Sequence, residues 1–305
     1  MADSTGPSVL DLHLDGVAPL HDPVLLVALD GWFDVAGVAT TALDHIVRDD
    51  AAVTVGDIDP DPFYDFTVER PLVEMVGDPT DPDVHEHREI VWPSNSIRYV
   101  RIGARHDLVA LSGVEPHLSW STYVRCVTTV IERLGVGLVV TLGAVADTTP
   151  HTRMPVVVGS TGDAALARRL ALSPPTYEGV TGVIGVLHTT LEALGVPSIS
   201  LRVGVPHYVA TGEHPRGVVS LVRHVSHVIE VPLTVDLTGS IELWDEQHTA
   251  AIAGDEQLRD YVRMLEGDYD RRAEEALASG DDVAAMFEEF LRDRPDDGDG
   301  DDEDD

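Results

Sequence analysis

Four continuous apolar runs, each followed by a stretch of helical periodicity, constrain this chain more than any other feature. They lie within residues 23–32, 107–113, 136–144 and 197–206. Apolar runs that end in turn residues are typical of strands buried on both faces of a parallel sheet. Strands that alternate with helices in this way predict an α/β layered domain with a largely parallel central sheet.

The helices between these runs are marked by apolar residues spaced three and four apart. The clearest covers residues 120–134, where we expect Ser119 to cap the start and Gly135 to end the helix. Residues 52–102 instead contain short alternating stretches, including "FYDFTVERPLV" and "REIVWPSNSIRYVRI", broken by Pro and Asn. This β-rich insert predicts a sheet that is mixed at one end.

Composition divides the chain into four parts. We predict a flexible lead-in at 1–22, an α/β sandwich domain at 23–238, a helical extension at 239–294 and a disordered acidic tail at 295–305. The extension carries only helical stripes, the last of which contains Val283, Phe287, Phe290 and Leu291. We expect it to pack on the α/β body or on another subunit.

Charge excludes several kinds of chemistry. The formal net charge of the 305 residues is −34, and all 20 basic residues are arginine. Without lysine, the chain cannot form a Walker-type phosphate loop, a Schiff base or the usual kinase site. Acidity of this size also repels nucleic acid and anionic membranes, so neither is an expected partner.

Cysteine content and hydropathy predict a cytoplasmic protein. Cys126 is the only cysteine, so no disulfide can form within the chain, which fits a reducing compartment. No apolar run is long enough to cross a bilayer, and the start of the sequence lacks the pattern of a secretory signal.

Polar side chains collect in the turns that follow the four apolar runs. If the strands are parallel, these turns meet at one rim of the sheet, the edge where open α/β folds bind ligands. Each turn taken alone is better explained by polar groups that satisfy the local backbone, and only the four turns together indicate a shared site. The candidate binding residues are Asp30, Trp32, Asp34, Ser112, Glu115, His117, Asp147, His151, Arg153, His207 and Tyr208.

Three further motifs indicate no complete catalytic or metal site. A Ser–His–Asp triad from Ser112 and His151 is not expected, because "LSGV" around Ser112 is not the Gly-x-Ser-x-Gly elbow of the α/β-hydrolases. The segment "HEH" at 85–87 has no third ligand at a defined spacing, so we predict no metal and no cofactor. The turn "GSTGD" at 159–163 precedes a helix and fits either an anion site or, more simply, a local cap.

Several longer stretches resemble a known family. They are "LDGWFDVAGVAT", "LSGVEPHLSWSTYVRCV", "VVTLGAVADTTPHTRMPVVVGST", "LSPPTYEGVTGVIGVLH" and "PSISLRVGVPHYV". Together they span residues 23–230, and in order and content they are similar to the bacterial, actinobacterial-type branch of the proteasome assembly chaperone family.

This resemblance implies an α/β/α sandwich of three layers with a mixed sheet, similar to nucleoside phosphorylases and related hydrolases. It also implies a homo-oligomer, such as a trimer or small ring, and a non-catalytic binding or assembly role with a proteasome-related or other protein partner. Some bacterial members carry an ATP-grasp label, but those sites hold phosphates with lysines that this chain lacks. Archaeal members dock through a C-terminal hydrophobic–Tyr–any-residue tail, and Glu303–Asp305 departs from that pattern.

A second function stays open at this point. The same rim would suit an enzyme or sensor that binds a small nucleoside-like or carboxylate ligand at the carboxyl edge of the strands, although fold alone does not fix function.

Overall fold

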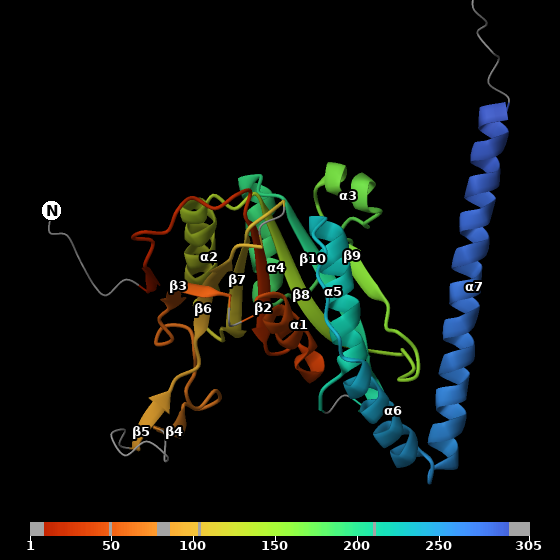
Figure 1. Cartoon of the computed structure of the whole chain (residues 1–305), viewed down its shortest axis with the longest axis horizontal. Coiled ribbons are helices and arrows are strands. Elements are labelled where there is room, and N and C mark those ends of the chain that lie inside the picture. The colour runs from red at the N-terminus through yellow and green to blue at the C-terminus, as the bar shows by residue number, and fades with distance from the viewer. Residues whose placement is uncertain (1–8, 49–50, 78–85, 103–104, 210–211, 293–305) are drawn as a thin grey trace, which may run out of the picture. The chain divides into compact units, whose positions relative to one another are not determined.

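The computed structural model describes residues 9–48, 51–77, 86–102, 105–209 and 212–292, with side chains to residue 275. The chain divides into two compact units, 1–249 and 250–305, which are described separately. The first unit is built on an eight-stranded sheet of order β1-β3-β6-β7-β2-β8-β10-β9 (Figure 1).

The four strongest apolar runs are neighbouring parallel strands at the centre of this sheet. They are β7 (Leu108–Val114), β2 (Val24–Asp30), β8 (Leu138–Asp147) and β10 (Ser198–Pro206). The prediction of a largely parallel central sheet is therefore confirmed.

Antiparallel strands complete the sheet on both sides. β6 (Asn95–Val100), β3 (Val53–Ile58) and β1 (Leu10–Leu12) extend it beyond β7. β9 (Val157–Ser160) extends it beyond β10, so the sheet is mixed at both ends rather than at one. β1 lies in the segment expected to be a flexible lead-in, because pairing with β3 gives it a place in the sheet.

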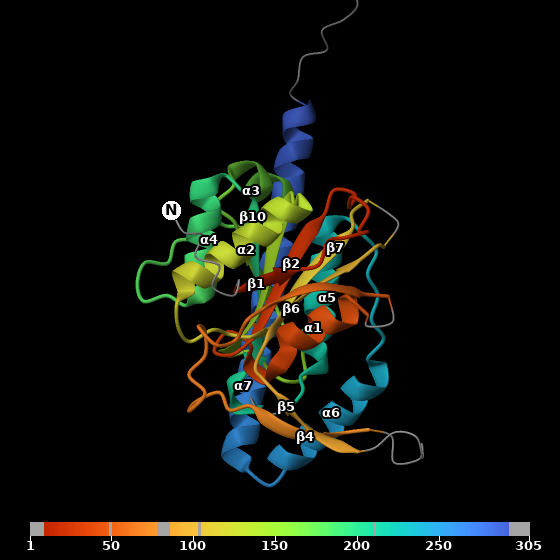
Figure 2. The same ribbon diagram turned by 90° about the vertical axis from the view of Figure 1, so that its left-hand side faces the viewer.

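Helices cover both faces of the sheet and complete the predicted three layers. α1 (Val38–Ile46) and α5 (Pro215–Ile229) pack on one face, while α2 (Trp120–Leu134) and α4 (Val183–Leu194) pack on the other (Figures 1 and 2). Successive side chains of β2 point to opposite faces of the sheet, so this strand contributes to the core on each face. Leu26 packs on the side of α1 and α5, and Leu25 packs on the side of α2 and α4.

Local turn chemistry decides where several elements begin and end. Gly135 adopts the left-handed conformation and ends α2 as predicted, but the Ser119 side chain makes no capping hydrogen bond. Asp163 accepts the amides of Ala165 and Leu166 and so caps α3 (Ala164–Leu170), which matches the simpler interpretation of "GSTGD".

The expectation of a strand in "FYDFTV" is wrong. Residues 63–69 form turns, in which Asp65 accepts the backbone N–H of Thr67 at 2.9 Å. The apolar character of this stretch comes instead from Phe63 and Tyr64, which are buried under α2.

The rest of the β-rich insert forms a separate hairpin. β4 (Leu72–Val76) pairs antiparallel with β5 (His87–Val91), and every residue of both strands is exposed. His85 of the "HEH" segment lies outside the described residues, and His87 lies in β5.

The last described part of the chain is helical. α6 (Thr238–Ile252) contains the point, after residue 249, at which the chain divides into its two units. α7 (Glu256–Arg292) forms the second unit. The expected acidic tail and the side chains of the Val283–Leu291 stripe lie outside the described residues. Over the described part of the chain, no helix combines the length and apolar character needed to cross a bilayer.

Candidate functional site

The carboxyl ends of the four central strands lie along one edge of the sheet, which we call the rim. Asp30 stands opposite Val114 in the β2–β7 pairing, and Pro206 stands opposite Asp147 in the β10–β8 pairing. The turns after these strands therefore come together at the rim, as parallel topology requires.

Glu115 links the turns after β2 and β7. Its backbone N–H donates to the carbonyl of Asp30 at 2.8 Å, and its Oε2 accepts the backbone N–H of Trp32 at 3.0 Å. A Cβ at position 31 would lie 2.6 Å from Oε2 of Glu115, so glycine there lets the carboxylate approach the turn. The Trp32 side chain stays 84% exposed.

Asp34 has a structural role at the start of α1. Its carboxylate accepts the N–H of Ala39 at 2.6 Å, the N–H of Thr40 at 3.2 Å and the Thr40 hydroxyl at 2.5 Å. The residue is only 4% exposed, and this burial raises the pKa of the carboxyl while the Thr40 hydrogen bond opposes the rise. Asp34 therefore caps the helix and does not face the solvent at the rim.

Two other candidates form hydrogen bonds with segments outside the four rim turns. Ser112 lies within β7, where its Oγ accepts a hydrogen bond from Arg98 Nη2 at 3.1 Å. His117 turns toward the 59–69 loop: its Nδ1 accepts the backbone N–H of Asp65 at 3.3 Å. These partners give no support to a Ser–His–Asp arrangement built on Ser112.

The β8–β10 half of the rim is also held by internal hydrogen bonds. His207 Nδ1 donates to the carbonyl of Asp147 at 3.0 Å. The Asp147 carboxylate accepts the N–H of Thr148 at 2.7 Å, and it covers Gly204, where a Cβ would lie 2.5 Å from Oδ2. Arg153 follows in the same loop, half-buried, with Nη1 donating to Thr152 Oγ1 at 3.2 Å.

His151 is buried at 1% exposure and is anchored by Tyr208. The Tyr208 hydroxyl accepts the backbone N–H of His151 at 2.8 Å and lies 2.9 Å from its Nδ1. His151 thus connects the β8 loop to the turn after β10.

Sequence reasoning missed the residues that surround His151. Trp244 and His248 of α6 stack at 3.9 Å between ring centroids, and the Trp244 ring lies 6.0 Å from His151. His214, just before α5, packs edge-on against Trp244 at 4.9 Å. The spacing of Trp244 and His248, four residues apart on one helix, was the signal that could have indicated this cluster.

His151, His214, Trp244 and His248 form a group that we call the histidine–tryptophan cluster. Within it, His214 has a structural role at the start of α5. Its Nδ1 accepts the N–H of Gly217 at 3.2 Å and so caps α5. Burial, reinforced by the neighbouring Arg216 and His248, lowers the pKa of His214 to about 4. The His214 side chain is therefore neutral at physiological pH, and its ring contact with Trp244 joins the start of α5 to α6.

The described residues contain no group of three or more His, Cys, Asp or Glu side chains able to hold a metal ion. The rim therefore combines engaged polar groups with one exposed tryptophan. Such a surface suits recognition of another molecule more than acid–base or nucleophilic chemistry.

A scan against protein-family models matches the PAC2 family over residues 28–252. No match is found among the curated proteins.

Several solved structures are similar to this chain. A PAC2 family protein of Streptomyces avermitilis is 34% identical, with a TM-score of 0.70, and covers 79% of this chain and 100% of its own. A proteasome-assembly chaperone homologue of Mycobacterium tuberculosis is 35% identical, with a TM-score of 0.69, and covers 78% and 99%. The archaeal proteasome activator PbaB of Pyrococcus furiosus, at 13% identity and a TM-score of 0.58 over 80% of this chain and 97% of its own, shares the fold. The family profile covers the rim and the α6 contact together, and this chain belongs to the PAC2 family.

Proposed function

We propose that this chain is a non-catalytic, protein-binding member of the PAC2 family that assists the assembly of a protein complex. The observation that carries the proposal is Trp32, which is 84% exposed on a rim where Asp34, Glu115 and His207 are held by hydrogen bonds to the backbone. Tryptophan is enriched among the residues that dominate protein–protein binding, because its large ring loses much apolar surface when a partner covers it.

The loop before α4 also carries exposed apolar side chains. A Cβ at position 182 would be 3.3 Å from Glu115 Oε1, so the loop before α4 approaches the residue that holds the Trp32 turn. In that loop Tyr177 is 74% exposed and Val180 is 91% exposed. Trp32, Tyr177 and Val180, which we call the rim patch, supply an apolar contact surface of the kind found at interfaces.

The alternative of an enzyme or sensor for a small nucleoside-like or carboxylate ligand is less well supported. Such sites need polar groups that converge on a cavity and are available to the ligand. At this rim the Asp34 carboxylate caps α1, Glu115 holds the Trp32 amide, and His207 bonds to a carbonyl. Few polar groups remain to orient a small molecule.

The partner we propose is proteasome-related. The support is the 35% identical relative described as a proteasome-assembly chaperone homologue, and the match over residues 28–252. A cytoplasmic location fits this proposal, because the one cysteine, Cys126, is a buried free thiol. A net charge of −34 disfavours nucleic acid as an alternative partner.

We also propose that the chain forms a homo-oligomer through the β4–β5 hairpin. An isolated two-stranded hairpin is marginal in water, and every residue of this one is exposed. Val73, Met75 and Ile90 share one of its faces and are 64%, 59% and 53% exposed. Covering that face with a second copy would stabilise the hairpin and remove its apolar surface from water.

Binding to the proteasome subunits of the same organism tests the main proposal. Biolayer interferometry with purified α- and β-subunits is expected to show an affinity that falls by about tenfold or more in Trp32→Ala. Leu194→Ala is the matched control, because it removes a 59% exposed apolar side chain at the end of α4, next to the amino ends of the strands.

Equal affinity of the two variants and the wild type would refute the role of the rim patch. Absence of any binding to proteasome subunits, together with a rise in melting temperature on adding nucleosides or small carboxylates, would favour the enzyme or sensor instead.

A further inference from the structure

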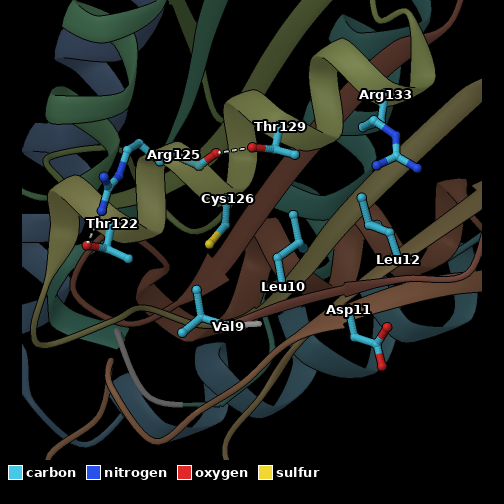
Figure 3. A pocket seen from close by; sticks show the side chains of 9 residues that line it. All are labelled: Val9, Leu10, Asp11, Leu12, Thr122, Arg125, Cys126, Thr129 and Arg133. Carbon is cyan, nitrogen blue, oxygen red and sulfur yellow. Dashed lines mark hydrogen bonds between the residues drawn. The ribbon is translucent and has the colours of Figure 1, made fainter. Parts of the chain in front are cut away.

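A groove of about 450 Å³ lies between α2 and the edge strand β1, outside the rim (Figure 3). Its walls are one side of α2, with Thr122, Arg125, Thr129 and Arg133, and the β1 segment that includes Leu10 and Leu12. Cys126, buried in the core, forms part of its floor. The groove thus has an apolar base and polar, cationic edges, as ligand sites commonly do.

The helix wall is one continuous face. Arg125, Thr129 and Arg133 follow one another at intervals of four residues, which places them on the same side of α2. On the opposite wall, Leu10 and Leu12 pack against the core beneath α2, and Asp11 projects to the other side of the strand (Figure 3). Asp11 also lines the groove, and its carboxylate lies 3.3 Å from Nε2 of His13.

Both arginines are exposed and lack an acidic partner among the described residues. Arg125 Nη2 donates to the Thr122 hydroxyl at 2.9 Å, while Arg133 makes no hydrogen bond or ion pair within the described part of the chain. Elsewhere arginines do find carboxylates, as in the pairs Arg98–Asp44 and Arg101–Asp107. In a chain of net charge −34, two unneutralised guanidinium groups along one groove form a local cationic site.

Spacing indicates which anion would fit. Eight residues of α-helix separate Arg125 from Arg133 by about 12 Å along the axis. In an extended peptide, side chains four residues apart point to the same face and are about 13 Å apart. A single phosphate cannot span this distance, and a long polyanion would be repelled by the remaining charge of the chain.

We propose that this groove binds an extended acidic peptide segment of a partner protein, with carboxylates four residues apart that pair with Arg125 and Arg133. Along α2, Thr129 lies between the two arginines and Thr122 lies one turn before Arg125. The hydroxyls of both threonines offer oxygen acceptors to peptide N–H groups. The apolar base contacts the intervening side chains. The site does not depend on the rim patch.

Fluorescence anisotropy with labelled peptides tests this proposal on the full chain at low ionic strength, where exposed ion pairs are least screened. The probe is a blocked, otherwise neutral decapeptide with two Glu residues four positions apart. The peptides for comparison have Gln at both positions or Glu residues three positions apart. We expect the first peptide to bind about tenfold more tightly than either of the others.

Matched variants separate the site from the general charge. Arg125→Ala with Arg133→Ala is expected to weaken binding of the first peptide about tenfold. Arg169→Ala, which removes an exposed arginine from α3, and Trp32→Ala, which removes the rim tryptophan, are expected to leave it unchanged. Because Trp32→Ala tests the rim separately, failure of one proposal is distinguishable from failure of the other.

Equal binding of the Glu and Gln peptides would overturn the proposal, as would an equal loss in Arg169→Ala. Sedimentation velocity gives a further decisive outcome. If the double variant lowers self-association and leaves peptide binding unchanged, the occupant of the groove is a second copy of this chain and not an acidic peptide.

Discussion

At the scale of single residues, polar side chains at the rim divide into those that build the fold and those that face solvent. Asp34 and Asp30 are four residues apart in the same turn, yet Asp34 is 4% exposed and Asp30 is exposed. The difference follows from α1, whose first amides need an acceptor and find it in Asp34. Residue type alone does not distinguish the two carboxylates.

Asp34→Ala is expected to lower the free energy of unfolding by about 1–2 kcal/mol, because the amides of Ala39 and Thr40 lose their acceptor. Asp34→Asn keeps one acceptor oxygen and should cost about half as much. Urea denaturation measures both. Asp30→Ala serves as the control and should change stability by less than about 0.5 kcal/mol. A loss as large for Asp30→Ala would contradict the assignment of the cap.

At the scale of elements, the β4–β5 hairpin differs from every strand of the main sheet in having no covered face. Its cross-strand pair Glu74–Glu89 places like charges opposite one another, which adds to its intrinsic weakness. The hairpin is therefore the element whose stability depends most on a partner.

Val73→Asp combined with Ile90→Asp is expected to reduce the proposed homo-oligomer to monomers, because the charges would oppose burial of that face. Size-exclusion chromatography with light scattering measures the mass. Val156→Asp combined with Val158→Asp is the control, since it places the same charges on the exposed valines at 54% and 50% near β9. An unchanged mass in the hairpin variant would show that copies meet elsewhere.

At the scale of the whole molecule, the buried histidines link stability to pH. Burial lowers the pKa of His214 to about 4 and that of His188, bonded to Thr141 and Ser198, also to about 4. Unfolding returns each imidazole to water, where its pKa is near 6.5. Between pH 6.5 and 4 the unfolded chain binds more protons, so stability falls as pH is lowered through this window.

We expect His214 alone to contribute a loss of about 2 kcal/mol between pH 7 and pH 5. The groups that face it are Arg216 and Asp245 and the other histidines of the cluster. His214→Asn, which can still cap α5, should flatten the plot of unfolding free energy against pH. His227→Asn changes an exposed imidazole and should not. Identical slopes for wild type and His214→Asn would contradict the role of burial.

The sequence by itself determined the central architecture. Runs such as residues 23–30 and 136–144 are apolar on both faces, and only a strand covered by two layers of helices buries both. The same order of strands brings Asp30, Glu115, Asp147 and His207 to one rim, because parallel strands share their carboxyl edge. The family resemblance, carried by long motifs, was confirmed over residues 28–252.

Tertiary structure decided the rest, because it depends on partners far away in the chain. β1 and β9 are three and four residues long, too short for a pattern, and exist through pairing with β3 and β10. The burial of His151 beside Tyr208 and Trp244 required α6 to return to the rim from some ninety residues away along the chain. A sequence pattern predicts on which face of a helix or strand a residue lies. The role of that residue depends on which other residues the folded chain packs against that face.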